Sequence, residues 1–110
     1  MKEMRMGVII ATNEHETVWN AFRFGVTALG TGHQVTIFLT GKGVEAQDIT
    51  DEKFNVTEQM DKFTSAGGLM LACGTCLKSR HKDGTETCPI STMKDMLKLV
   101  EESDRVLTFG

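Results

Sequence analysis

The chain has 110 residues, of which 40% are hydrophobic and 25% are charged, and its formal net charge is −3. This composition is that of an ordinary globular protein, and the length predicts a single domain over residues 1–110. Because there is no basic stripe, no apolar run near roughly 18 residues and no signal-peptide pattern, we expect a cytoplasmic protein that binds neither nucleic acid nor a membrane.

The first third of the chain predicts a strand, a helix and a second strand. Residues 5–12, RMGVIIAT, form an apolar run that is typical of a strand buried on both faces of a parallel sheet. Residues 13–32 predict a helix, because their apolar side chains recur at helical spacing. Asn13 and Glu16 form a capping pair at its start, and glycines end it. Residues 33–40, HQVTIFLT, are rich in β-branched side chains and predict the second strand.

The middle of the chain predicts a loop, a helix and a third strand. Residues 41–53 read as a loop that begins with the turn-forming GKG triplet. Residues 55–68 predict a helix that begins at Asn55 and stops at a glycine pair. Residues 69–73, LMLAC, form a short apolar run without alternation, which again indicates a strand of a parallel sheet.

The last part predicts a short helix, an edge segment, a further helix and a final strand. The short helix begins after Thr75 and ends near Gly84, and TETCPI at 85–90 is irregular or a brief edge strand, because its proline cannot donate to a ladder. Thr92 and its partner Asp95 open the next helix. The expected inner face of the helix that begins at Thr92 consists of Met93, Met96, Leu97 and Val100. Residues 104–110 are expected to form the last strand.

This order of elements predicts the α/β class, with a parallel sheet covered by helices on both faces. In such sheets, ligands and reactive groups collect at the carboxyl ends of the strands. Three predicted loops meet at that edge, at Thr12–Asn13, Gly41–Gly43 and Cys73–Gly74. The candidate functional site is therefore expected at this edge.

The stretch ACGTCLKSR at 72–80 carries two of the three cysteines, Cys73 and Cys76. An odd number of cysteines gives no disulfide framework. Gly74 allows a sharp turn into the following helix, and a thiol at a helix start near basic residues has a lowered pKa. Those basic residues are Lys78 and Arg80, which either tune the thiolate or receive an anionic partner; on a short exposed helix, such residues are more often simply solvated.

Four interpretations of this stretch remain open from the residues alone. The thiols are inert core residues, a dithiol redox pair, part of a zinc site, or a sulfur-transfer centre that forms a persulfide. The spacing is unlike common zinc patterns, so we expect no metal. The zinc alternative uses Cys73, Cys76, His81 and Cys88.

Long segments of the chain resemble the DsrE/DsrF-like (YchN-like, TusD-related) sulfur-relay family. The similarity covers nearly the whole sequence, and its last two segments carry most of it. The segments are GVIIAT, VTIFLTGKGV, AGGLMLACGTCLKSR and ISTMKDMLKLVEESDRVLTF.

The resemblance implies a three-layer α/β/α domain with a five-stranded parallel sheet, assembled into homotrimers or hexamers. It also implies that Cys73 accepts sulfane sulfur from a donor protein as a persulfide and passes it to an acceptor, without an organic cofactor. Cys76 departs from the single-cysteine pattern, because a neighbouring thiol can attack a persulfide, release sulfide and leave a disulfide. A non-catalytic oligomeric subunit and a thiol–disulfide protein remain the alternatives.

Other positions receive weaker assignments. Asn13 is a candidate binding residue, although helix capping accounts for it more simply, and Cys88 beside the proline is expected at an edge as an unreactive thiol. Trp19, Phe22 and Phe24 give the first helix more apolar surface than one core-facing stripe needs, which predicts partial burial between subunits. Core packing is the expected role of Met60, Met70, Met93 and Met96.

Overall fold

A five-stranded sheet forms the centre of the protein in the computed structural model, which describes residues 2–110. All neighbouring strands pair in parallel, in the order β4-β3-β2-β1-β5. The strands are β1 (Arg5–Ile10), β2 (Gln34–Leu39), β3 (Leu69–Cys73), β4 (Ile90–Ser91) and β5 (Arg105–Phe109). The predicted parallel sheet is confirmed.

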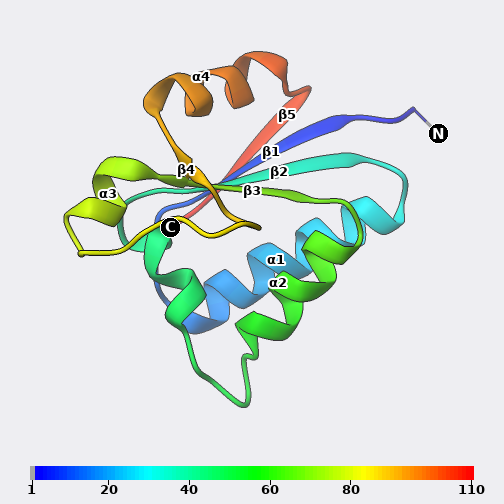
Figure 1. Ribbon diagram of the computed structural model, residues 1–110. Coiled ribbons are helices and arrows are strands. Elements are labelled where there is room, and N and C mark those ends of the chain that lie inside the picture. The colour runs from blue at the N-terminus through cyan, green and yellow to red at the C-terminus, as the bar shows by residue number, and fades with distance from the viewer. Residues whose placement is uncertain (1) are drawn as a thin grey trace.

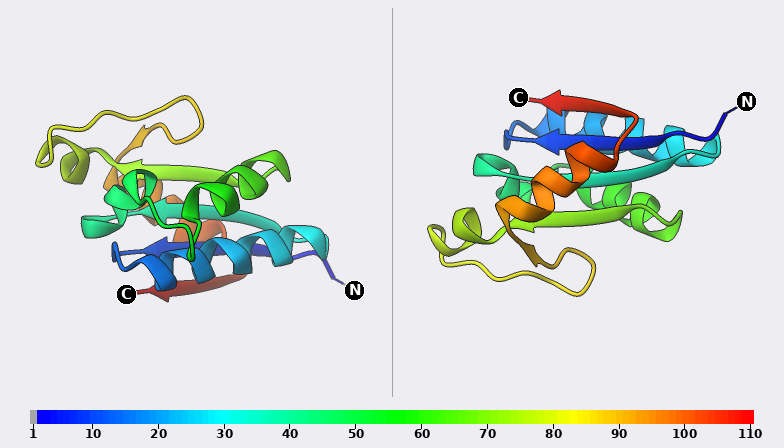
Figure 2. Two further views of the ribbon diagram at one scale, coloured as in Figure 1. Left: turned by 90° about the horizontal axis from the view of Figure 1, so that it is seen from below. Right: turned by 90° about the horizontal axis from the view of Figure 1, so that it is seen from above.

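Helices cover both faces of this sheet (Figure 1). They are α1 (His15–Gly30), the 3₁₀ helix η1 (Gly41–Asp48), α2 (Val56–Ser65), α3 (Gly74–Lys78) and α4 (Met93–Glu102). Helices α1 and α2 lie side by side under one face, and α4 crosses the other face obliquely (Figure 2). These three layers agree with the predicted α/β/α architecture. No helix among residues 2–110 is long and apolar enough to cross a membrane.

The core lies mainly between the sheet and the α1–α2 layer. Phe22 of α1 and Phe63 of α2 are fully buried and meet edge to face, with ring centroids 5.8 Å apart. Gly25 allows α1 to approach this pair, because a Cβ atom there would lie 2.8 Å from the Phe63 ring. Burial of each such aromatic side chain contributes about 2 kcal/mol relative to exposure, so this contact anchors the lower helical layer.

The caps of two helices match the sequence, and the cap of a third does not. Asn55 accepts a hydrogen bond from the Glu58 N–H at 3.1 Å at the start of α2, and a capping box opens α4. At α1, however, Glu14 caps the helix by accepting from the Glu16 and Thr17 N–H groups at 2.8 and 3.0 Å. The prediction that Asn13 caps α1 is therefore wrong, and its side chain is left for another contact.

The large apolar surface of α1 is covered in part by contacts within the chain. Phe22 is in the core, Trp19 packs against Phe54 with tilted rings 5.4 Å apart, and Phe24 lies 6.5 Å from Phe109, measured between ring centroids. Trp19 and Phe24 remain partly exposed, so the burial of this helix between subunits stays a prediction.

The segment predicted as a loop from residue 41 instead forms η1 over Gly41–Asp48. Gly41 has a φ of +53°, which favours glycine. A Cβ atom at Gly43 would lie 2.0 Å from the Ile10 carbonyl oxygen. The two glycines therefore let η1 turn back against the end of β1, beside the carboxyl edge of the sheet.

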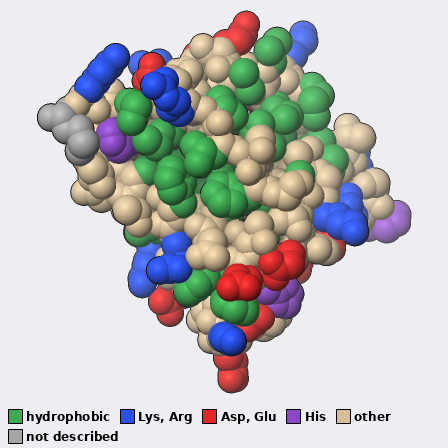
Figure 3. All heavy atoms as spheres, turned by 180° about the vertical axis from the view of Figure 1, so that it is seen from behind, with side chains coloured by type: hydrophobic (Ala, Val, Ile, Leu, Met, Phe, Trp, Pro, Cys, Tyr) green, Lys and Arg blue, Asp and Glu red, His purple; other side chains and the backbone are tan. Residues whose placement is uncertain are grey.

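Helix α4 turns a different face to the sheet from the one predicted, and of the expected inner residues only Met96 packs against the core. Leu99 faces the sheet, where Gly7 leaves room for it, since a Cβ there would lie 2.4 Å from Leu99 Cδ2. Met93, Leu97 and Val100 are 59%, 57% and 44% exposed. Viewed from behind, hydrophobic side chains gather across the centre and upper part of the surface (Figure 3).

The four methionines that were expected in the core differ in burial. Met60 and Met70 are buried as predicted, and Met96 is half-buried against the core. Met93 is exposed, so its assignment is wrong. The physical reason is that an apolar stripe shows which helix face is to be covered, but not by what.

Candidate functional site

The candidate site is formed where β3 ends, at the carboxyl edge of the sheet. Cys73 is the last residue of β3 and precedes α3, which was predicted to extend to about Gly84 but stops at Lys78. His81 has a φ of +54° and lies in the turn that ends the helix. A helix of this length supplies only a small dipole, so other groups must account for any activation of the thiols.

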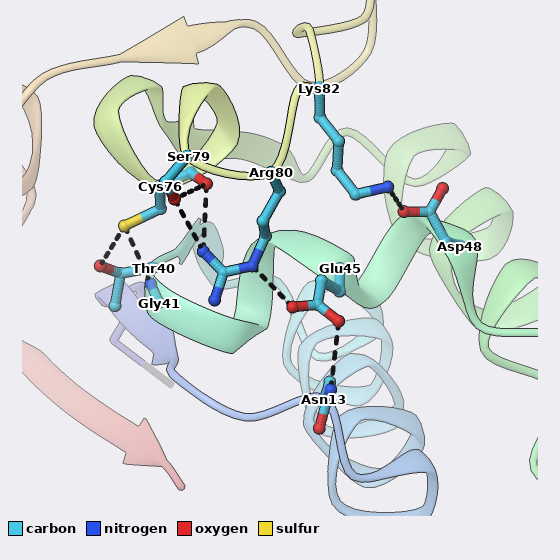
Figure 4. A network of polar contacts seen from close by, with 9 residues as sticks. All are labelled: Asn13, Thr40, Gly41, Glu45, Asp48, Cys76, Ser79, Arg80 and Lys82. Atoms are coloured by element: carbon cyan, nitrogen blue, oxygen red, sulfur yellow. Dashed lines mark hydrogen bonds and ion pairs between the residues drawn. The ribbon is translucent and has the colours of Figure 1, made fainter.

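Cys76 lies in α3, and its sulfur faces the start of η1 (Figure 4). The Gly41 N–H donates to Sγ of Cys76, with 3.2 Å between nitrogen and sulfur. The Thr40 hydroxyl oxygen lies 3.9 Å from the same sulfur. Two neighbouring residues at the end of β2 thus direct polar groups at one thiol.

These surroundings lower the pKa of Cys76. Partial burial acts to raise this pKa, but the neighbouring Cys73 side chain, the Gly41 N–H, the Thr40 hydroxyl and the Arg80 charge together outweigh it. Cys76 is half-buried, whereas Cys73 is only 3% exposed. The structure thus provides Cys76, the residue ranked second by sequence, with the better access and the surroundings that favour a thiolate.

Arg80 links this thiol to η1 (Figure 4). Its Nε donates to Glu45 Oε2 at 2.6 Å, and its Nη1 donates to the Cys76 carbonyl oxygen at 3.1 Å. Asn13 donates from Nδ2 to the other Glu45 oxygen at 3.2 Å. The hydrogen bond from Arg80, followed by that from Asn13, lowers the pKa of Glu45, which keeps this carboxylate charged.

Glu45 is the site residue that sequence reasoning missed. It lies 35 residues from Arg80 in the chain, in a segment that was predicted to be a loop. Nothing in the spacing of the two residues marks them as partners. A second ion pair, between Asp48 and Lys82, joins the same two segments.

Cys73 and Lys78 both border a hollow that Cys76 does not line. This hollow has a volume of about 260 Å³. Gly74 also contributes, because a Cβ there would lie 2.8 Å from Ile90 Cγ2 and narrow this space. The residues around the hollow are Cys73, Gly74, Thr75, Lys78, Ile90, Ser91, Thr92 and Met93. Lys78 and Arg80, grouped together by sequence, therefore lie beside different thiols.

The remaining cysteine is set apart from this pair. Cys88 is fully buried in the hydrophobic core, and burial raises its pKa to about 11. Within residues 2–110, no three or more His, Cys, Asp and Glu side chains are grouped so as to hold a metal ion. Cys73, Cys76, His81 and Cys88 thus do not form the zinc site that their order in sequence allows.

The protein is a three-layer α/β protein with a parallel sheet, and two thiols lie at the carboxyl edge of that sheet. Reactions of cysteine sulfur are therefore its candidate chemistry. The sequence matches the model of the DsrE/DsrF-like family over residues 4–109, and the chain belongs to this family. The family is sulfur-relay related. The resemblance identified from the sequence is thereby confirmed.

Two relatives match this sequence over most of its length. The uncharacterized protein MJ0989 of Methanocaldococcus jannaschii is 34% identical over 114 residues, covering 96% of this chain and all of that protein. The uncharacterized protein MK0008 of Methanopyrus kandleri is 36% identical over 100 residues, covering 86% of this chain and 83% of that protein.

The crystal structure of the YchN protein from E. coli has the same fold. Its TM-score against this protein is 0.83, with 98% of this chain and all of that chain covered. The two sequences are 20% identical, so this likeness establishes the architecture.

Proposed function

We propose that this protein is a sulfur carrier that accepts and donates sulfane sulfur as a cysteine persulfide at the Cys73–Cys76 pair. The observation that carries the proposal is the pairing of a half-buried thiol, supplied with an N–H donor and a nearby guanidinium, with a second, shielded thiol. Membership of a sulfur-relay family supports it. The reacting groups are the thiols themselves.

In the first step, the Cys76 thiolate attacks the terminal sulfur of a donor persulfide, R–S–SH. The donor's S–S bond breaks as the bond to Cys76 Sγ forms, and the donor leaves as the thiolate R–S⁻. Cys76 suits this role because thiolate character and access govern the rate of exchange. The Gly41 N–H and Arg80 favour the charged form of the sulfur before it attacks.

In the second step, Cys73 takes the terminal sulfur from Cys76. The Cys73 sulfur attacks the terminal sulfur, the Cys76 S–S bond breaks, and the Cys73 proton ends on the leaving Cys76 sulfur, so the two cysteines exchange a thiol for a persulfide without net oxidation. The carrier role thus stays on Cys73, as the resemblance implies. Its burial slows attack on the persulfide by small thiols in solution, and the adjoining hollow offers space for the added atom.

Lys78 and Arg80 are the proposed sites of attraction for an anionic donor or acceptor. Lys78 is exposed beside the hollow at Cys73, and Arg80 lies beside Cys76. Asn13 contributes only through Glu45, and Gly74 contributes by leaving the hollow open. The partners are donor and acceptor proteins in the cytoplasm, where the three unpaired cysteines remain reduced.

Loading with glutathione persulfide, followed by intact-mass and peptide mass spectrometry, tests the proposal. We expect one added sulfur in the wild type, located on Cys73. Cys76→Ser should slow uptake, Cys73→Ser should leave the sulfur on Cys76, and the matched control Cys88→Ser should load normally. Absence of added sulfur in the wild type would overturn the proposed function, and unchanged uptake by Cys76→Ser would overturn the order of the two steps.

We also infer that the protein forms a homotrimer or hexamer through the outer face of α4. Met93, Leu97 and Val100 lie at i, i+4 and i+7 and form one exposed apolar stripe. Light scattering should give an oligomer for the wild type and a smaller species for Leu97→Lys. A wild-type monomer at micromolar concentration would contradict this inference.

A further inference from the structure

We propose that Glu45 is a positioning residue for Cys76: by holding Arg80, it fixes η1 against α3 and keeps the Gly41 N–H directed at the Cys76 sulfur. This inference rests on the proposed function only in treating Cys76 as a reacting thiol. Glu45 does not touch the sulfur, so its effect is transmitted through the segments that it joins.

The geometry provides a direct mechanical link. Helix η1 supplies both Glu45 and the Gly41 N–H that reaches Cys76. The Arg80 guanidinium holds the Glu45 carboxylate at 2.6 Å and the carbonyl oxygen of Cys76 at 3.1 Å. One side chain therefore ties η1 to the backbone of the residue whose sulfur η1 contacts.

Both Glu45 oxygens are engaged, which restricts the carboxylate to one orientation. Arg80 occupies Oε2, and Asn13, from the connection between β1 and α1, donates to Oε1 at 3.2 Å. The Arg80 Nη1 also lies 3.3 Å from Ser79 Oγ. An isolated ion pair at the surface contributes little to stability, but a network anchored at several segments is suited to fixing geometry.

A second ion pair in the same region provides a matched control. Asp48 of η1 pairs with Lys82, which follows α3, so it joins the same two segments as the Glu45–Arg80 pair. Neither residue of this second pair has a hydrogen bond to Cys76. Removing the charge of Asp48 therefore tests for a general loosening of η1 without disturbing Arg80.

The sign of the effect separates positioning from simple electrostatics. The groups that act on Cys76 are the neighbouring Cys73 thiol, the uncharged Thr40 and Gly41 groups, and the Arg80 charge. Glu45→Gln removes a negative charge near this thiolate, which by Coulomb interaction alone would favour the thiolate. If the carboxylate acts by positioning, its loss withdraws the Gly41 N–H and the guanidinium, and the thiolate becomes less favourable.

The test is the pH dependence of iodoacetamide alkylation at Cys76, resolved by peptide mass spectrometry in the full-length protein. We expect Glu45→Gln to shift the profile to higher pH and to slow alkylation about fivefold at pH 7, the effect of losing one hydrogen bond. Asp48→Asn should leave the profile unchanged. An unchanged or lowered apparent pKa in Glu45→Gln would overturn the inference.

A double-mutant cycle confirms the route of the effect. In an Arg80→Gln background, Glu45→Gln should add no further slowing, because the two residues act as one unit; additive effects would contradict the proposed link. Circular dichroism checks that each variant remains folded, and Asn13→Ala provides a second variant that should shift the profile less, in the same direction. Sulfur uptake is measured separately, so a wild type that takes up no sulfur would refute the proposed function and leave the alkylation result standing.

Discussion

Cys76 and Cys88 lie in the same small molecule, but their surroundings shift their pKa values in opposite directions. Cys76 is half-buried at the carboxyl edge, where the Cys73 side chain, a backbone N–H, a hydroxyl group and a guanidinium lower its pKa against the opposing effect of burial. Cys88 is fully buried in the hydrophobic core, which raises its pKa to about 11. Burial alone raises the pKa of a thiol, whereas hydrogen-bond donors and a positive charge directed at a partly buried sulfur lower it.

The largest expected effect is the difference in labelling rate between these two thiols. The pKa of Cys76 is lowered, whereas that of Cys88 is raised to about 11, so near neutral pH Cys76 carries far more thiolate than Cys88. Iodoacetamide labelling of the folded protein should therefore modify Cys76 much faster, also because Cys88 is fully buried. Comparable rates at the two sites would break the comparison.

The stability of the protein should fall at high pH because of Cys88. Its pKa in the folded state is about 11, raised from an ordinary value of 9.0. The stabilisation is therefore fully present below pH 9 and is lost as the pH rises toward 11, at a cost of about 2–3 kcal/mol.

Urea unfolding at a series of pH values measures this loss. Cys88→Ala removes the ionisable group, so its stability should be lower at neutral pH but should decline less between pH 9 and 11. An equal decline in this variant and the wild type would assign the effect to other groups.

Serine substitution should affect the two positions differently. At Cys88 it places a hydroxyl group in the hydrophobic core, which should cost about 1–3 kcal/mol. At Cys76 the Gly41 N–H and the Thr40 hydroxyl remain available to the new oxygen, so the free energy of unfolding should change by less than about 0.5 kcal/mol. Equal destabilisation at both positions would contradict the contrast in surroundings.

Arg80→Gln should produce the smallest effect, and at Cys76 alone. Loss of the Arg80 charge and of the tie to Glu45 should raise the pKa of this thiol and slow its alkylation about fivefold at pH 7, as Glu45→Gln does. The alkylation profile of Cys76 reports this shift, and the slow labelling of Cys88 in the same samples serves as the internal control. A shift at both cysteines would indicate general unfolding.

Most of the fold was predictable because its patterns are local. The apolar runs at 5–12 and 69–73 mark buried parallel strands, and Asn55 and Thr92 start helices where expected. The α1 cap shows the limit of such patterns, since Asn13 and Glu14 are both able to accept hydrogen bonds from the first turn. The structure uses Glu14, and Asn13 contacts Glu45 instead.

The error in predicting which residues of α4 face the sheet has a different cause. The stripe at Met93, Leu97 and Val100 is a true apolar face, but the sequence of one chain does not distinguish a sheet of the same chain from another surface. Leu99 gains its place against the sheet because Gly7 lies opposite, a contact between residues distant in sequence.

The candidate site was predictable in position but not in detail. Parallel-sheet topology placed the thiols at the carboxyl edge. The ranking of Cys73 above Cys76 depended on the family resemblance and on a helix dipole, yet α3 has only five residues. Besides the neighbouring Cys73, the groups that lower the pKa of Cys76 come from Gly41, Thr40 and Arg80, and only the folded chain brings these three residues to the sulfur.

Transfer of sulfur from the loaded protein to an acceptor thiol tests the central claim most directly. The protein is loaded with persulfide, freed of donor and mixed with a protein thiol, and sulfane sulfur, sulfide and free cysteines are then quantified. The carrier account predicts that sulfane sulfur appears on the acceptor while Cys73 and Cys76 both return to free thiols. Release of one sulfide per chain together with a Cys73–Cys76 disulfide would contradict it.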